Sequence, residues 1–129
     1  MNGKYLLDTS IIIALFLDDQ TVKRALNKAA EVFVPVIAIG ELYYGALRSG
    51  RVVENLQKID QMITSVAILD CDHETARIYG FIKNKLRERG RPIPENDIWI
   101  AVIAVQKGLT LATRDTHFAE IPDLNFVFG

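Results

Sequence analysis

Residues 5–13 read YLLDTSIII, and the carboxylate inside this apolar run marks the point from which the fold can be worked out. The apolar residues 5–7 predict a buried strand, because a short apolar run closed by a polar cluster is typical of one. Asp8 follows where this strand ends. Two roles remain open for its side chain: it can cap a helix over residues 11–17, as Thr9 or Ser10 also can, or it can serve a functional site.

The bulk composition bounds the class of protein. The chain has 129 residues, of which 50% are apolar, and this suits one compact domain. Its 15 Lys and Arg against 16 Asp and Glu give a formal charge of -1, so any nucleic-acid surface must be local. Cys71 is the single cysteine, and neither a signal peptide nor an apolar run of about 20 residues is present. We therefore expect a soluble protein of the cytoplasm.

Apolar runs and helical patterns alternate along the chain. Strands are expected at residues 5–7, 32–34, 66–69, 109–112 and 126–128. Helices are expected at residues 11–17, 21–30, 37–47, 51–64, 74–89 and 97–107, with Asn96 as the cap of the last one. This alternation predicts an α/β fold, a single-domain three-layer sandwich in which a mainly parallel sheet of about five strands carries helices on both faces.

Four carboxylates fall where such a sheet collects ligands, beyond the carboxyl ends of its strands. Asp8 ends the first strand and Asp115 follows the fourth. Glu41 lies in the helix after the second strand among apolar neighbours, where an unpaired charge is costly. Asp97 opens the last helix and can bring a fourth carboxylate to the same edge. Simpler roles stay open for two of them, since Asp97 can complement a helix dipole and Asp115 can be a turn residue.

If the four carboxylates converge, they need a compensating cation. At a separation of about 6 Å and an effective dielectric constant near 20, each pair of carboxylates repels by about 3 kcal/mol. The summed repulsion of several pairs is therefore comparable with the free energy of unfolding of a whole domain. Mg²⁺ or Mn²⁺ fits such a site, whereas zinc fits poorly because His73 and His117 share no ligand spacing. A carboxylate-held metal suits phosphodiester hydrolysis, where it polarises the phosphate. Ser10 and Thr113 can orient a water or a carboxylate there, or can act simply as caps.

Four segments, in order, resemble the PIN-domain family and more narrowly its VapC-type toxin ribonucleases. LLDTSIII with Asp8 resembles the D-x-S opening of the family, and ELYYGA with Glu41 resembles its E-L-x-x-G helix. NDIWIA with Asp97 resembles its D-x-x-I-A helix, and LATRDTHF with Thr113 and Asp115 resembles its T-x-D-x-x-F ending. The resemblance covers essentially the whole chain, so residues 1–129 are expected to form one PIN-like nuclease domain.

The resemblance implies an endoribonuclease that depends on Mg²⁺ or Mn²⁺ and hydrolyses RNA phosphodiester bonds as the toxin of a toxin–antitoxin pair. It implies a homodimer and a catalytic, metal-binding site made of Asp8, Glu41, Asp97 and Asp115. It also implies a small antitoxin whose C-terminal segment covers the site, and the negative pocket predicts basic residues in that segment. The alternative is a non-catalytic protein-binding module that retains an acidic pocket.

Basic and aromatic residues give less direct signals. Arg114 neighbours Asp115 and can grip an RNA phosphate or form a salt bridge. Five more basic residues near the end of helix 74–89 can meet phosphates or simply form a solvated helix end: Lys83, Lys85, Arg87, Arg89 and Arg91. Tyr43, Tyr44 and Trp99 can stack on bases, but their helical positions are more typical of core or dimer contacts.

Overall fold

The computed structural model describes residues 3–128, in which strands and helices alternate. The strands are β1 (Lys4–Leu7), β2 (Glu31–Pro35), β3 (Ala67–Leu69), β4 (Thr110–Thr113) and β5 (Phe126–Phe128). The helices are α1 (Thr9–Phe16), α2 (Gln20–Asn27), α3 (Val36–Leu47), α4 (Val52–Ile63), α5 (His73–Glu88) and α6 (Glu95–Lys107), and a short 3₁₀ helix, η1 (Thr116–Glu120), follows β4. Within these described residues, no helix is both long and apolar enough to cross a membrane.

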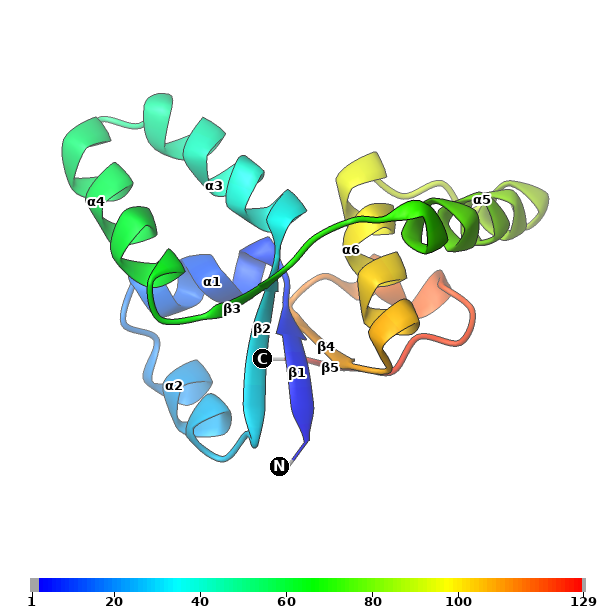
Figure 1. The fold of residues 1–129 in the computed structure, drawn as a ribbon, viewed down its shortest axis with the longest axis horizontal. Coiled ribbons are helices and arrows are strands. Elements are labelled where there is room, and N and C mark those ends of the chain that lie inside the picture. The colour runs from blue at the N-terminus through cyan, green and yellow to red at the C-terminus, as the bar shows by residue number, and fades with distance from the viewer. Residues whose placement is uncertain (1–2, 129) are drawn as a thin grey trace.

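The strands form one parallel sheet of order β3-β2-β1-β4-β5. Helices α1 to α4 lie on one side of the sheet and α5 and α6 lie on the other (Figure 1). Parallel neighbours need crossover connections, so helices cover both faces. The architecture is therefore the α/β sandwich that the sequence predicts.

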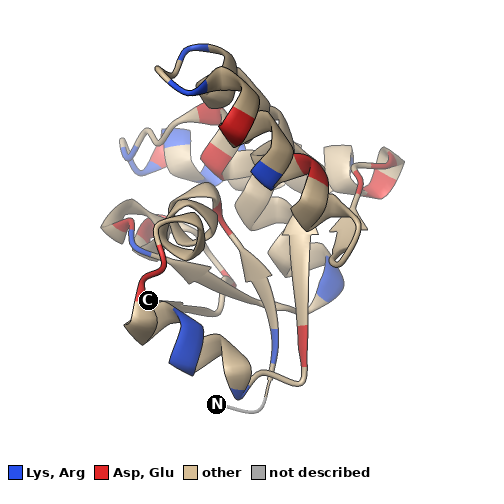
Figure 2. Cartoon of the chain, turned by 90° about the vertical axis from the view of Figure 1, so that its left-hand side faces the viewer, with Lys and Arg blue, Asp and Glu red and all other residues tan. Residues whose placement is uncertain are grey.

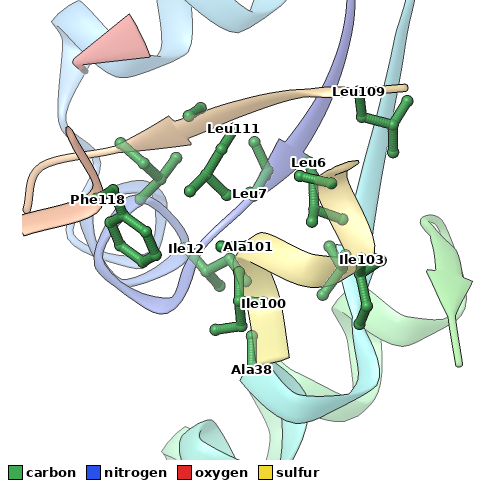
Figure 3. Packing of buried hydrophobic residues seen from close by; sticks show 14 of the residues in the cluster. Leu6, Leu7, Ile12, Ala38, Ile100, Ala101, Ile103, Leu109, Leu111 and Phe118 are labelled. Carbon is green, nitrogen blue, oxygen red and sulfur yellow. The ribbon is translucent and has the colours of Figure 1, made fainter. Parts of the chain in front are cut away.

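The core lies where α6 packs against the central strands. Ile100 and Ile103 of α6 have no exposed surface, and neither do Leu6 of β1 and Leu111 of β4. Figure 3 shows these side chains gathered between the helix and the sheet. Because a close-packed core resists displacement, this packing holds the first turn of α6, which carries Asp97, at the carboxyl edge of the strands.

Strand order reverses between β1 and β4, since the chain runs from β1 to β2 and β3 on one side and from β4 to β5 on the other. The backbone N–H of Asp8 donates to the carbonyl of Ala112 at 3.1 Å, which continues the β1–β4 pairing to the edge. Crevices at such a reversal are where α/β sheets bind ligands. The ends of β1 and β4 therefore lie side by side at the predicted ligand-binding edge.

The predicted helices are all present, with ends that differ from prediction by up to three residues. The predicted cap of the last helix was wrong, because α6 begins at Glu95 and Asn96 lies inside its first turn. Pro94 occupies the N-cap position without a side-chain hydrogen bond. Its carbonyl accepts the N–H of Ile98 at 3.1 Å, so the extended proline starts the helix. The short helix η1 was not predicted, since five residues carry too little periodic pattern.

A buried threonine holds the start of α5 against α6. Thr75 has no exposed surface, and its hydroxyl lies 2.9 Å from a carboxylate oxygen of Asp72 and 2.6 Å from Oε1 of Gln106. Asp72 caps α5 by accepting the backbone N–H of Thr75 at 2.9 Å, and it also accepts Nε2 of Gln106 at 3.0 Å. These hydrogen bonds favour the ionised carboxylate and lower the pKa of Asp72 to about 2.

An Asp72→Asn variant should lose part of the acid sensitivity of the fold. The pKa of Asp72 is about 2 in the folded chain, below its unfolded value of about 3.9. Its ionised form therefore stabilises the fold above about pH 4, and this contribution disappears as the pH falls toward about 2. In calorimetry the wild-type Tm should exceed that of the variant at neutral pH, and the difference should shrink in acid. A difference in Tm that does not change with pH would contradict this assignment.

Candidate functional site

Asp8 is a buried carboxylate at the junction of β1 and α1. Its side chain is only 2% exposed. Oδ1 accepts hydrogen bonds from Oγ of Ser10 at 2.6 Å and from the backbone N–H of Ile11 at 3.0 Å, and Oδ2 accepts from Oγ1 of Thr113 at 2.5 Å. Of the two roles that the sequence leaves open, the capping role is confirmed, since Asp8 caps α1. Its place at the predicted ligand-binding edge is compatible with the functional role, which stays a prediction.

Two hydroxyls tie the end of β1 to the segment after β4. Besides donating to Asp8, Oγ1 of the fully buried Thr113 accepts the backbone N–H of Asp115 at 2.9 Å. Oγ of Ser10 likewise donates to Asp8 and accepts the backbone N–H of Arg114 at 3.1 Å. Each hydroxyl is therefore held in one orientation, and together they position the segment that carries Asp115.

Asp97, Asp115 and His117 form a group of possible metal ligands whose ligand atoms all lie within 4.8 Å of one another. Nε2 of His117 lies 2.8 Å from Oδ2 of Asp97. Burial raises the pKa of Asp97 above its ordinary value, although the nearby His117 opposes that shift. The charges of Glu41 and Asp115 raise this pKa further, so negative charge is crowded at this edge.

Glu41 reaches the same edge from the second turn of α3. Its Oε1 accepts a hydrogen bond from Oγ1 of Thr9 at 2.7 Å, which links α3 to α1. The side chain is half-buried, and this hydrogen bond compensates for its apolar surroundings. The four predicted carboxylates are thus brought to one edge of the sheet from the end of β1, from α3, from α6 and from the segment after β4.

The donors at this edge fit a hard or borderline divalent cation. Asp97 and Asp115 offer carboxylate oxygens, which suit Mg²⁺ and Mn²⁺, and His117 offers a ring nitrogen, which suits a transition metal such as Mn²⁺ better than Mg²⁺. Asp8 and Glu41 lie outside this group of three, and each accepts a hydrogen bond from a hydroxyl. Their predicted role as metal ligands stays a prediction.

His117 is the site residue that sequence reasoning missed. Its ring contacts the ring of the fully buried Phe118, which anchors η1 to the core. Spacing between the two histidines gives no hint of its role, because His73 begins α5 instead. The available signal was the position of His117 two residues after Asp115. His117 contacts Asp97 only because η1 turns the chain back.

Salt bridges engage three of the six basic residues that the sequence singles out. Nη2 of Arg114 lies 2.5 Å from Oδ2 of Asp19, and Lys83 and Arg91 each pair with a glutamate. Figure 2 shows Lys and Arg scattered among Asp and Glu on the side of the molecule that faces the viewer. The salt-bridge interpretation is confirmed for Arg114, and its contact with RNA stays a prediction.

The aromatic residues divide into two kinds. The rings of Trp99 and Tyr79 stack between α6 and α5 with centroids 4.0 Å apart. The hydroxyl of Tyr43 donates to Oδ1 of Asp60 at 2.6 Å and links α3 to α4. Tyr43 and Trp99 are thus structural contacts, as their helical positions predict, whereas Tyr44 is 66% exposed.

An apolar groove of about 310 Å³ lies between α1, α3 and α4 and is bordered by Glu41. Ile13 is 46% exposed there although it is a large apolar residue. Exposed apolar surface of this kind marks interaction sites. Further apolar residues line the groove: Phe16, Leu17, Leu42, Ala46 and Ile59.

The chain is similar in sequence and in fold to known proteins. The family model of the PIN domain matches residues 5–124. A Haemophilus influenzae protein named Ribonuclease VapC2 is 35% identical over 114 residues, which cover 87% of this chain and 86% of that protein. The crystal structure of VapBC2 from Rickettsia felis, bound to a DNA fragment from the promoter, matches with a TM-score of 0.89 at 26% identity and covers 98% of both chains. VapBC-5 from Mycobacterium tuberculosis, a member of the VapBC family of toxin-antitoxin systems, matches with a TM-score of 0.78 at 26% identity over 97% of this chain and 96% of that one.

A Thr113→Val variant should destabilise the fold by about 2 kcal/mol, because a buried hydrogen bond to a charged group contributes roughly 1.5–3 kcal/mol. Valine keeps the shape but leaves Oδ2 of Asp8 and the N–H of Asp115 without the hydroxyl. Urea unfolding measures the change. Thr113→Ser keeps the hydroxyl and serves as the control. Equal stability of the valine variant and the wild type would show that the hydroxyl does not hold this edge together.

Proposed function

Since this chain belongs to the PIN-domain family, we propose that it is the toxin ribonuclease of a toxin–antitoxin pair and hydrolyses phosphodiester bonds within RNA. The observation that carries the proposal is the set of carboxylates at the β1–β4 edge, in a chain 35% identical to a ribonuclease over most of its length. Residues 1–129 act as one nuclease domain. The protein works as a homodimer in the cytoplasm, where it meets its RNA.

Four carboxylates and one imidazole would hold Mg²⁺ or Mn²⁺ at this edge: Asp8, Glu41, Asp97, Asp115 and His117. When bound, the ion supplies positive charge that polarises the scissile phosphate and stabilises the leaving oxygen. Three hydrogen bonds hold the carboxylate of Asp8 in one orientation. Ser10 and Thr113 are supporting residues, since they keep the Asp115 segment beside Asp8.

Neutralising any one of the four carboxylates should lower the cleavage activity without lowering the stability of the fold. Asp8→Asn, Glu41→Gln, Asp97→Asn and Asp115→Asn should each lower RNA cleavage at least about 100-fold, since loss of a ligand costs more than loss of a supporting contact. Asp97→Asn should also raise the Tm of the metal-free protein, because burial and neighbouring charge already disfavour its ionised form. Cleavage assays and thermal melts in EDTA measure the two effects.

The matched controls are Asp70→Asn, which neutralises an exposed acid after β3, two strands from β1, and Glu88→Gln, which neutralises an exposed acid at the end of α5. In the wild type, Mg²⁺ or Mn²⁺ should raise the Tm and EDTA should stop cleavage, because a ligand that binds only the folded state stabilises it. Cleavage that persists after complete metal removal would point to a metal-independent nuclease. Loss of secondary structure by circular dichroism in all four variants would make the acids structural and favour the non-catalytic module.

We further propose a small antitoxin as the partner. The apolar groove beside Glu41 suits the apolar face of a helix laid between α1, α3 and α4. The crowded carboxylates next to it favour a cationic side chain, and an Arg offers two parallel hydrogen bonds. A basic C-terminal segment in the groove would therefore exclude both the ion and the RNA phosphate.

An Ile13→Asp variant should keep its ribonuclease activity and escape the antitoxin. Ile13 lines the groove and is 46% exposed, so a charge there disturbs docking more than folding. The small protein encoded beside this gene is titrated into the cleavage assay with wild type and variant, and inhibition should weaken at least about tenfold. The antitoxin with its C-terminal basic residues changed to Ala should also inhibit poorly. Unchanged inhibition in both experiments would overturn the occlusion mechanism while leaving the nuclease assignment intact.

A further inference from the structure

Positive charge is concentrated where α5 ends and α6 begins. Residues 83–95 contain five Lys and Arg and only two Glu, in a chain whose totals are 15 Lys and Arg against 16 Asp and Glu. The excess of cations is therefore a local feature that the formal charge of -1 conceals. A local cluster of cations of this kind is typical of a surface that meets a polyanion.

These residues border a hollow between the end of α5 and the start of α6 (Figure 1). Its volume is about 300 Å³. Leu86 and Ile98 are buried and give it an apolar floor. Three cations line it: Lys83, Arg87 and Arg91. Apolar surroundings lower the local dielectric constant, so a cation at this hollow attracts an anion more strongly than a fully hydrated cation does.

The backbone brings Arg87 and Arg91 to the same hollow. Gly90 has a φ of 64°, in the left-handed region, and turns the chain back at the end of α5. The N–H of Arg91 donates to the carbonyl of Leu86 at 3.0 Å, which returns Arg91 to the last turn of the helix. Pro92 then restricts the backbone of the segment that leads to α6. The two arginines are therefore placed together before any ligand arrives.

Ion pairs engage only part of this positive charge. Lys83 pairs with Glu95. Nε of Arg91 lies 3.8 Å from Oε2 of Glu120, at the long end of the range for an ion pair. Within residues 3–128, no hydrogen bond or ion pair engages the side chain of Arg87. Arg87 is thus available to an anion, and Arg91 can turn to one at little cost, because exposed ion pairs contribute little.

The hollow lies around the first turn of α6 from Asp97. Glu95 and Ile98 line the hollow and are three residues apart, so they share one face of the helix, whereas Asp97 does not line it. One turn of a helix rises only about 5 Å. A strand that crosses the start of α6 therefore passes from the carboxylates to the cations within a short distance.

We infer that this hollow binds phosphate groups of the RNA strand beyond the cleaved bond, with Arg87 and Arg91 as the cationic contacts. The inference rests on the proposed function. A guanidinium group suits this role because it can donate two parallel hydrogen bonds to phosphate oxygens. Arg87 and Arg91 are then substrate-binding residues outside the acidic edge, and they hold the part of the strand that the carboxylates do not attract.

The test is binding of a 12-nucleotide single-stranded RNA of mixed sequence to the full chain in EDTA, measured by fluorescence anisotropy over a range of KCl concentrations. Arg87→Gln and Arg91→Gln should each flatten the slope of log K against log[KCl] by about 0.7, the contribution of one phosphate contact on a single strand. The double variant should bind about tenfold more weakly at low salt. Arg87→Lys keeps the charge and should keep the wild-type slope.

Lys85→Gln is the matched control, because Lys85 is an exposed cation of the same last turn that does not line the hollow. It removes one positive charge from the same helix end and should leave the slope unchanged. The inference is overturned if Lys85→Gln flattens the slope as much as Arg87→Gln, since the charges would then act only as a solvated helix end. A wild-type slope in the double variant also overturns it.

Two further outcomes would assign the hollow to a protein instead. If the double variant binds RNA normally but binds the small protein encoded beside this gene more weakly, the hollow is a docking site for that protein. If the double variant loses RNA only because a dimer dissociates in light scattering, the arginines are subunit contacts. Either result overturns the inference.

The two levels of proposal fail separately. If the wild type cleaves no RNA with Mg²⁺ or Mn²⁺ present, the proposed ribonuclease is wrong. If the wild type cleaves RNA, the double variant should cleave the 12-nucleotide strand with a raised KM and an unchanged kcat, because the arginines bind the strand away from the cleaved bond. An unchanged KM would show that only the phosphate-binding role of this hollow is wrong.

Discussion

The constraint on which the site depends is the burial of the Asp8 carboxylate. A carboxylate that is 2% exposed is tolerated only when hydrogen bonds replace its lost water. Asp8 obtains them from both sides of the strand-order reversal, through the start of α1 and through Thr113 at the end of β4. The same two oxygen atoms therefore cap one helix and hold two central strands in alignment. The segment that carries Asp115 follows from that alignment.

Crowding of like charge is the second consequence of this geometry. Asp97 is carried by α6, whose middle turns are buried in the core, so it cannot move away from Glu41 and Asp115. The close packing around Ile100 and Ile103 thus maintains an electrostatically unfavourable arrangement in the absence of an ion. Such destabilised arrangements are typical of functional sites, where binding of a ligand recovers the stability.

The sequence predicts well whatever depends on local pattern. Apolar runs located β1 to β5, helical periodicity located α1 to α6, and the ends of the strands pointed to the edge of the four acids. Contacts between segments distant in the sequence were harder to predict. Asn96 is a good capping residue by type, yet Pro94 starts the helix. His117 meets Asp97 only through the turn of η1, which no periodicity encodes.

Thr9 and Glu41, which share a hydrogen bond, line both the apolar groove and a second hollow between α3 and the start of α6. If Glu41 holds an ion as proposed, an occupant of the apolar groove that extends a cation to Glu41 would draw its carboxylate away from that ion. Binding free energies at two sites that share one group are reciprocal, so an ion or RNA at the edge would weaken that occupant by the same factor. Control of the enzyme would then act through the shared carboxylate and not only through steric exclusion. Under the proposed function Glu41, more than the deeply buried Asp8, is where inhibition and substrate binding would compete.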